Sequence, residues 1–176
     1  MDKLLKSSML LAAGVGLMAC ADPPQDCGQL PVDVSTGNAG CLVVDGERWL
    51  LVQQRLGEAW AIPGGTAQAG ERAACTAARE TREETGIEVR VTARLAVLDN
   101  GFHVYACVAP EGVPPLPRDV HEIRAAAWKS PAERQQLDWR FPAQPAQLQR
   151  LLQAGGDSSR SHQSATVLPR SVKDSP

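Results

Sequence analysis

The sequence predicts an α/β domain in which helices cover a mixed β-sheet, and three observations support this fold class. Two apolar runs near the start are divided by Asp45-Gly46, which is a hairpin signal. An alanine-rich segment has the pattern of a helix that stops at Gly86, where a left-handed C-cap belongs. Further strand-like and helical segments follow, and such an alternation favours a sheet packed between helices.

Each element has its own signal. Alternation of apolar and polar residues indicates half-buried strands, and the prolines between residues 111 and 119 exclude regular structure there. Pro131 opens a short helix, and Leu148, Leu151 and Leu152 mark the apolar face of a last helix. In chain order, the predicted elements are a hairpin at 39–55, a loop at 60–65, a helix at 70–85, strands at 87–98, 102–109 and 122–129, and helices at 131–137 and 145–153.

Size and charge limit the function classes. The chain has 176 residues, which corresponds to about one domain, and it shows no internal repeat. Its formal net charge is -2, with acidic and basic residues interspersed. A nucleic-acid-binding domain usually carries a basic surface, so we expect no nucleic-acid partner. The sequence leaves the oligomeric state open.

The N-terminus has the pattern of an export signal. Lys3 and Lys6 precede an apolar run from Met9 to Ala19, which is shorter than the ~20 residues of a comfortable bilayer span and suits the core of a signal peptide. The ending LMAC resembles the lipobox of bacterial lipoproteins. By that resemblance, residues 1–19 are a lipoprotein signal peptide and Cys20 is the lipidated first residue of the mature chain.

That resemblance implies a location in the bacterial cell envelope. Lipid on Cys20 would anchor the protein to a membrane without spanning it, with the domain facing the periplasm. Ala21, which follows the cysteine, resembles an outer-membrane address more than an inner-membrane one. An ordinary secretory signal with an incidental cysteine, and a buried helix of a cytoplasmic enzyme, are the alternatives.

The rest of the chain divides into three parts. Residues 20–37 are rich in proline, aspartate and glycine and predict a tether, residues 38–153 form the domain, and residues 154–176 have little to bury and predict a disordered tail. Four further cysteines can pair in an oxidising compartment in three ways, or can be small buried hydrophobic residues. They are Cys27, Cys41, Cys75 and Cys107.

Three glutamates crowd one face of the predicted helix at 70–85. At about 100° per residue, Glu80, Glu83 and Glu84 share one stripe, beside a second stripe of small residues that would allow close packing on a sheet. Like charges at this spacing repel, so the stripe is either solvated or holds a cation. Arg79 lies beside Glu83, where it can orient that side chain through a hydrogen bond. Hard carboxylate oxygens suit Mg²⁺ or Mn²⁺.

The segment from Gly65 to Ile87, GTAQAGERAACTAARETREETGI, matches the Nudix box of the Nudix hydrolase family. Every charged and glycine position of that box is filled. Thr81 stands where the family usually has a larger aliphatic residue, a difference in packing rather than chemistry. The likeness extends over residues 38–153 and implies a Nudix-type α/β/α sandwich around a mixed sheet.

The resemblance also implies an activity and a metal site. Glu80, Glu83 and Glu84 look like the metal ligands and catalytic residues, joined by the carbonyl of Gly64. The cofactor would be Mg²⁺ or Mn²⁺, and the substrate a small diphosphate compound. The implied reaction is hydrolysis of a diphosphate linkage, with the metal offsetting charge on the phosphates. A Nudix-fold lipoprotein that binds without cleaving is the alternative.

Other positions of the box carry supporting roles. Glu71 and Arg79 resemble the charges that orient the ligands, and Gly65 and Gly86 belong to the turns before and after the helix. Family members often recruit one more glutamate from outside the box. Glu122 is the best candidate for that catalytic role, ahead of Glu111 and Asp119.

Two residues outside the box are candidates for substrate binding. Arg55 follows the hairpin and could contact a phosphate, although an exposed strand-end arginine is equally plausible. Tyr105 could stack on a base or sugar, against the alternative of ordinary sheet packing. Phe141 and the tryptophans are predicted to be core or edge packing residues.

Overall fold

The computed structural model describes Cys27 and residues 33–163, with side chains up to residue 154. The predicted signal peptide, the lipidation site Cys20 and the chain after residue 163 lie outside the described residues. None of the described helices is long and apolar enough to cross a bilayer.

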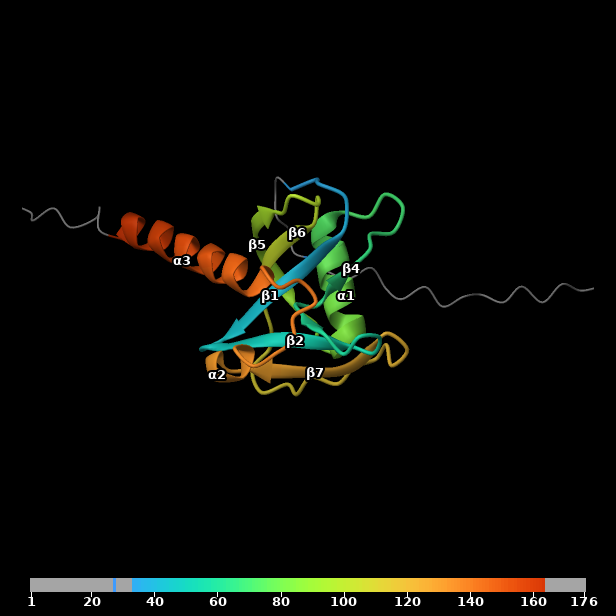
Figure 1. The fold of residues 1–176 in the computed structure, drawn as a ribbon. Helices are drawn as coiled ribbons and strands as arrows, with labels where there is room; N and C mark the ends of the chain where they lie inside the picture. Colours follow the sequence, from blue (N-terminus) through green and yellow to red (C-terminus); the bar gives the residue numbers. More distant parts are fainter. Residues whose placement is uncertain (1–26, 28–32, 164–176) are drawn as a thin grey trace, which may run out of the picture.

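The strands form one mixed sheet, as predicted (Figure 1). Its main path runs β3-β2-β1-β6-β5, with β4 paired to β1 and β7 paired to β2. The hairpin turns after Asp45, and β1 pairs in parallel with β6, whereas the other recorded strand pairs are antiparallel. The strands are β1 Ala39–Asp45, β2 Arg48–Gln54, β3 Trp60–Ala61, β4 Gly64–Gly65, β5 Arg90–Val97, β6 His103–Val108 and β7 Ile123–Lys129.

Helices pack against opposite faces of this sheet. Alternate residues of β1 point to opposite faces, as strand geometry requires: Val43 joins the alanines of α1 (Ala73–Thr85), and Leu42 joins Leu148 of α3 (Gln144–Gln163). The structure therefore confirms the predicted α/β/α sandwich.

The small residues of α1 allow it to lie close to the sheet. Its alanines at positions 73, 74, 77 and 78 are buried against the strands. Thr81 is also fully buried, and its hydroxyl donates to the Ala77 carbonyl at 2.7 Å, so no polar atom of that side chain is left unpaired. This packing fixes the adjacent acidic edge of α1 close to the sheet.

Three predicted boundaries differ in the structure. The predicted loop at 60–65 contains the short strands β3 and β4, which pair with the hairpin. The short helix α2 covers Pro131–Arg134 only. The last helix, α3, extends to Gln163, beyond the predicted end of the domain at residue 153.

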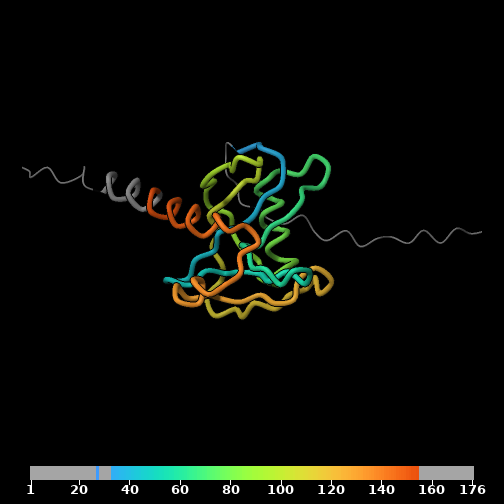
Figure 2. The backbone as a smooth tube through the Cα atoms, viewed as in Figure 1, coloured from blue at the N-terminus to red at the C-terminus, as the bar shows by residue number. Residues whose placement is uncertain are grey.

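The domain begins before the predicted boundary at residue 38. The phenol of Tyr105 donates to Asp33 Oδ2 at 2.7 Å, and Arg94 donates to Ser35 Oγ at 2.7 Å. The carbonyl of Ser35 accepts from the backbone N–H of Ala73, at the start of α1. In Figure 2 the blue start of the described chain accordingly lies beside β5 and β6.

The four cysteines form two disulfides, one of the three possible pairings. Cys41 of β1 is joined to Cys107 of β6, across the parallel pair of strands. Cys27 is joined to Cys75 of α1, which ties the segment predicted as a tether to the helix that carries the glutamates.

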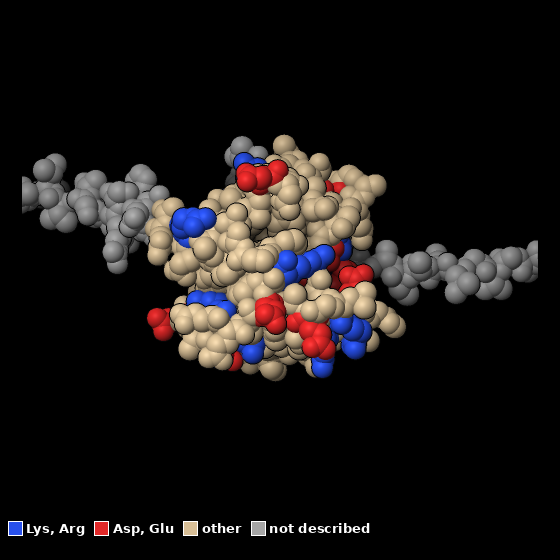
Figure 3. Space-filling view, viewed as in Figure 1, with Lys and Arg blue, Asp and Glu red and all other residues tan. Residues whose placement is uncertain are grey.

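Charged side chains are interspersed over the face of the described residues shown in Figure 3. That face has no broad basic patch of the kind that binds nucleic-acid phosphates.

The contact between Asp33 and Tyr105 predicts a pH dependence of stability. Burial would raise the pKa of Asp33, but hydrogen bonds from Ser35 and Tyr105 outweigh it and lower the pKa to about 2. Because the folded-state pKa is depressed, the stabilisation is present at neutral pH and disappears as pH falls from about 4 toward 2. Asp33→Asn should lower the free energy of unfolding at pH 7 by about 1–3 kcal/mol, and should flatten its dependence on pH in that range.

Urea denaturation at pH 7 and pH 3 measures this effect. The exposed Asp138 provides a matched control, because its side chain has no such contact; Asp138→Asn should behave as wild type. Equal loss of stability on acidification in wild type and Asp33→Asn would contradict the prediction.

Candidate active site

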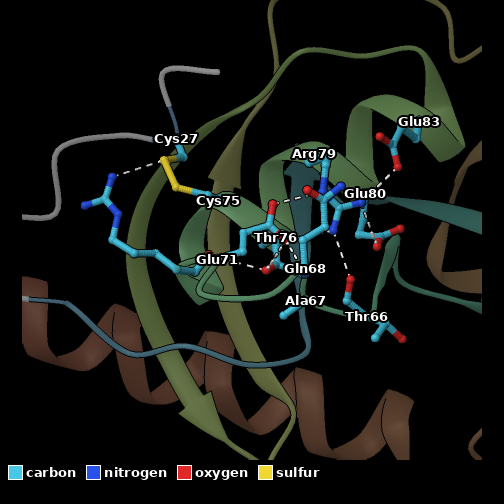
Figure 4. Close-up of polar contacts among 12 residues, drawn as sticks. Cys27, Thr66, Ala67, Gln68, Glu71, Cys75, Thr76, Arg79, Glu80 and Glu83 are labelled. Atoms are coloured by element: carbon cyan, nitrogen blue, oxygen red, sulfur yellow. Dashed lines mark hydrogen bonds and ion pairs between the residues drawn. A yellow bond between two sulfur atoms is a disulfide. The ribbon is translucent and has the colours of Figure 1, made fainter. Parts of the chain in front are cut away.

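The guanidinium of Arg79 lies at the centre of the acidic edge of α1 (Figure 4). Its Nε and Nη2 each donate to one oxygen of Glu71 at 2.9 Å. Its Nη1 donates to Glu80 at 2.9 Å and to Glu83 at 3.0 Å, so the predicted Arg79–Glu83 hydrogen bond is present. Nη2 also donates to the carbonyl of Thr66 at 2.9 Å. One cation thus offsets three carboxylates that would otherwise repel one another.

Glu71 contacts the loop before the helix in addition to Arg79. Its Oε2 accepts from the hydroxyl of Thr76 at 3.0 Å and from the backbone N–H of Gln68 at 2.9 Å. The hydrogen bond from Arg79 is the main cause that lowers the pKa of Glu71, so Glu71 stays ionised at neutral pH. This carboxylate therefore helps to orient Arg79 and the loop before the helix.

Glu84 is the most buried of the helix glutamates. It is 6% exposed, and its Oε2 accepts from the backbone N–H of Gly64 at 2.7 Å. Burial raises its pKa to about 8, against the opposing effects of the Gly64 hydrogen bond and the charge of Arg140. Glu80 also has a raised pKa, through burial first, with Arg79 opposing the shift. The hydrogen bonds and positive charges near Glu80 and Glu84 therefore offset only part of the cost of ionising these buried carboxyl groups.

Two glycines allow strand β4 to approach these carboxylates. A Cβ on Gly65 would lie 2.6 Å from Cδ of Glu80, and a Cβ on Gly64 would lie 2.5 Å from the backbone Cα of Gly40. A side chain at Gly64 would collide with the backbone of β1, and one at Gly65 would displace the carboxylate of Glu80. Gly64 is therefore required for the pairing of β4 with β1, and Gly65 leaves room for the carboxylate of Glu80.

The loop that follows residue 115 caps the C-terminal end of α1. Gly86 adopts the predicted left-handed conformation, with φ 72°. The N–H groups of Leu116 and Asp119 donate to the carbonyls of Thr85 and Glu83 at 2.7 and 2.8 Å. These bonds satisfy carbonyls that have no partner within a helix, and they hold the loop against the acidic edge.

Glu122 is carried by this loop into the same cleft as the helix glutamates. Asp119 Oδ1 accepts from the N–H of Glu122 at 3.1 Å. The N–H of Arg55 donates to the Glu122 carbonyl at 2.8 Å, and its Nε donates to the Val120 carbonyl at 2.8 Å. The charge of Glu122 acts on both Glu80 and Glu84, so the structure brings this predicted residue to the acidic edge.

Four glutamates therefore line one cleft of about 820 Å³ together with Gly64. They are Glu80, Glu83, Glu84 and Glu122. Within the described part of the chain, no three acidic, histidine or cysteine side chains converge on one point. Arg79 accounts for this arrangement, because it draws the carboxylates of Glu80 and Glu83 toward itself.

The residues of the cleft fit a divalent cation. All of the donors are hard oxygens, which suits Mg²⁺ or Mn²⁺. The buried and only partly compensated carboxylate of Glu84 would be stabilised in its ionised form by such an ion. The carbonyl of Gly64 lines the same cleft, and its role as a ligand stays a prediction.

The two predicted substrate-binding residues lie elsewhere. Tyr105 is fully buried, packs in the core beneath α1, and bonds to Asp33, so its packing interpretation was the correct one. Arg55 does not line the cleft; its guanidinium is engaged with the carbonyls of Val120 and Ile123. Its contribution is to hold the loop that carries Glu122.

Sequence reasoning missed the part of the cleft that lies next to α3. Arg140, Phe141 and Gln144 lie just before and at the start of α3 and line the cleft. Phe141 is 46% exposed, so it is not a core residue. No spacing rule links these residues to the glutamates, so no sequence pattern predicts that they line the cleft.

Comparisons with known proteins place the chain in a family. A family model described as the NUDIX domain matches residues 35–151. A protein of Streptomyces ambofaciens named "MutT-like protein" is 31% identical over 115 residues, which are 62% of this chain and 72% of that protein.

Solved structures show the same fold. A NUDIX hydrolase from Nitrosomonas europaea superposes with a TM-score of 0.59 at 21% identity, over 69% of this chain and 90% of that one. A UDP-X diphosphatase superposes with a TM-score of 0.57 at 21% identity, over 69% of this chain and 64% of that one, so the match spans slightly less than two thirds of that protein. The family match, together with the arrangement of Arg79 and the glutamates, leads to one conclusion: the chain belongs to the Nudix family.

Proposed function

We propose that this protein hydrolyses the diphosphate linkage of a nucleoside diphosphate derivative or a related diphosphate compound in the bacterial cell envelope, with Mg²⁺ or Mn²⁺ as cofactor. The observation that carries the proposal is the cleft in which Glu80, Glu83, Glu84 and Glu122 gather. Hydrolysis of a P–O–P bridge requires that phosphate charge be offset and that a water molecule lose a proton.

Each group has a task in this chemistry. Glu80, Glu83 and Glu84 would hold the divalent ions, which supply charge compensation for the phosphate oxygens. Arg79 fixes the rotamers of Glu80 and Glu83 through its hydrogen bonds, and pre-organisation of this kind lowers the cost of reaching a reactive geometry. Glu122 is exposed in the cleft and can accept a proton from the attacking water.

The cysteines support an oxidising location. All four described cysteines are paired, as Cys27–Cys75 and Cys41–Cys107. Disulfides persist in exported proteins and are rare in the cytosol. Together with the lipobox-like sequence ending at Cys20, they favour an envelope protein anchored by lipid and facing the periplasm, on the outer membrane in preference to the inner one.

The proposed activity predicts a large loss on Glu83→Gln. The substitution removes the charge of a metal-binding carboxylate without changing its size, so kcat should fall by at least about 100-fold, the upper end of the cost of losing a supporting group. Product release from a panel of nucleotide sugars, other nucleoside diphosphate derivatives and lipid-linked diphosphates measures this. Glu88→Gln is the matched control, since Glu88 is exposed and lies outside the cleft.

Two outcomes of that panel would contradict the proposal. Equal turnover by wild type and Glu83→Gln would identify a contaminating enzyme. Binding of a diphosphate compound by wild type without any turnover would favour the non-catalytic lipoprotein instead.

The proposed metal site predicts a stabilisation by cation. An ion that binds the folded protein at 100 times its Kd adds about 2.7 kcal/mol, which corresponds to a rise in Tm of roughly 5–10 °C for a domain of this size. Thermal unfolding of wild type with saturating Mg²⁺ or Mn²⁺ should show this rise, and so should Glu88→Gln. Glu80→Gln should show a much smaller one; an unchanged Tm in wild type would speak against the site.

The proposed anchor predicts lipid on Cys20. Cells grown with a clickable palmitate analogue should incorporate label into the full chain and not into Cys20→Ala. The wild type should sediment with membranes, whereas Cys20→Ala should not, because it has lost the acyl chains that hold it there. Unlabelled wild-type protein in the cytosolic fraction would contradict the proposed lipid anchor and would not bear on the proposed hydrolysis.

A further inference from the structure

Two leucines at one end of the domain have their side chains exposed to solvent. Leu56 is 89% exposed and Leu116 is 73% exposed, whereas every other leucine in the described part of the chain is buried or half-buried. Val120 is 55% exposed. These three residues are called the apolar rim below. Single exposed apolar residues are common in proteins, so a role for the apolar rim depends on where it lies and on what can cover it.

The residues of the apolar rim lie near the C-terminal end of α1 and are held there by hydrogen bonds. The N–H of Leu116 donates to the carbonyl of Thr85, in the last turn of the helix, at 2.7 Å. Arg55 precedes Leu56, and its Nε donates to the carbonyl of Val120 at 2.8 Å. Prolines on both sides of Leu116 restrict the backbone of its loop. The apolar rim is therefore a fixed feature of the surface.

Arg118 adds a positive charge between Leu116 and Val120. It is exposed, and its guanidinium has no hydrogen-bond or ion-pair partner among the described residues. Two acidic residues of the same loop, Asp119 and Glu122, line the cleft. Basic side chains close to a membrane are attracted by anionic lipid headgroups. The apolar rim and Arg118 thus combine the two kinds of group that hold proteins at the surface of an anionic bilayer.

The Cys27–Cys75 disulfide limits how far the domain can move from a lipid on Cys20. Cys27 follows Cys20 by seven positions, and a chain of that length spans at most about 25 Å. The disulfide fixes Cys27 to the first turn of α1. The helix has 13 residues and is therefore about 20 Å long, so the apolar rim at its other end can reach the bilayer. Without the disulfide, the first residue held by the domain would be Asp33, and the tether would span up to about 45 Å.

We propose that the apolar rim of Leu56, Leu116 and Val120 docks on the lipid bilayer to which Cys20 is anchored, with Arg118 at the level of the anionic headgroups. The short tether keeps the apolar rim at a high effective concentration near the membrane, so that a few apolar side chains suffice for docking. Because Leu56 also lines the cleft, docking brings the mouth of the cleft to the bilayer surface. This inference rests on the proposed lipid anchor, to which it adds an orientation of the domain.

Quenching of tryptophan fluorescence by lipids with brominated acyl chains tests this orientation, because bromine quenches only an indole that reaches the acyl chains. Leu116→Trp places an indole in the apolar rim. Val34→Trp is the matched control, since Val34 is 81% exposed and lies at the opposite end of α1, where the carbonyl of Ser35 accepts from the N–H of Ala73. The lipidated proteins are reconstituted into vesicles of phosphatidylethanolamine with phosphatidylglycerol as the anionic lipid. Wild type gives the background from the native tryptophans.

The expected result is quenching at one end of α1 only. The emission that Leu116→Trp adds to wild type should fall by about half or more, because a docked apolar rim lies at the boundary of headgroups and acyl chains. Adding Leu56→Ser to Leu116→Trp should reduce this quenching, and the emission that Val34→Trp adds should not be quenched. Equal quenching of the two tryptophan variants, quenching of Val34→Trp alone, or quenching of neither would overturn the inference. Thermal unfolding checks that the variants fold as wild type does.

Failure of the proposed anchor is a separate outcome. If wild type carries no lipid on Cys20, the anchor proposal fails, and the apolar rim is tested by mixing the unlipidated full chains with the same vesicles. Quenching of Leu116→Trp without quenching of Val34→Trp would still support docking of the apolar rim on a bilayer. No quenching, or equal quenching of both, would refute it. Neither result bears on the proposed hydrolysis, which the panel of diphosphate compounds tests by itself.

Discussion

The guanidinium of Arg79 lies among the carboxylates of Glu71, Glu80 and Glu83, and the rest of the site depends on this network. Without a cation there, three negative charges at one edge of α1 would repel one another. Arg79 also binds the carbonyl of Thr66, so the loop before the helix and the helix itself are fixed by one side chain. A compact acidic edge can therefore exist before any metal is bound.

Close packing places that edge at the sheet. The alanine stripe of α1 lets the helix approach the strands, and the glycine pair Gly64-Gly65 lets β4 approach the helix. Together they enclose Glu84, whose burial raises its pKa to about 8. The same small residues that stabilise the fold thus create the buried carboxylate on which the proposed metal chemistry relies.

The two ends of the cleft are built by different segments of the chain. The acidic end is built by α1 and by the loop of Glu122, which Arg55 and the last carbonyls of α1 hold in place. The other end is built by the segment 140–144, which carries an unpartnered amide.

The sequence by itself determined the elements and the acidic edge, because both follow from local rules. Residue periodicity fixes strands and helices, and the spacing of Glu80, Glu83, Glu84 and Arg79 fixes which side chains share one face of a helix. Only the tertiary structure decided the rest. Three features depend on contacts between segments far apart in the chain, and no local periodicity encodes such contacts. They are the burial of Tyr105, the contact of Arg55 with the loop that carries Glu122, and the position of Gln144 in the cleft.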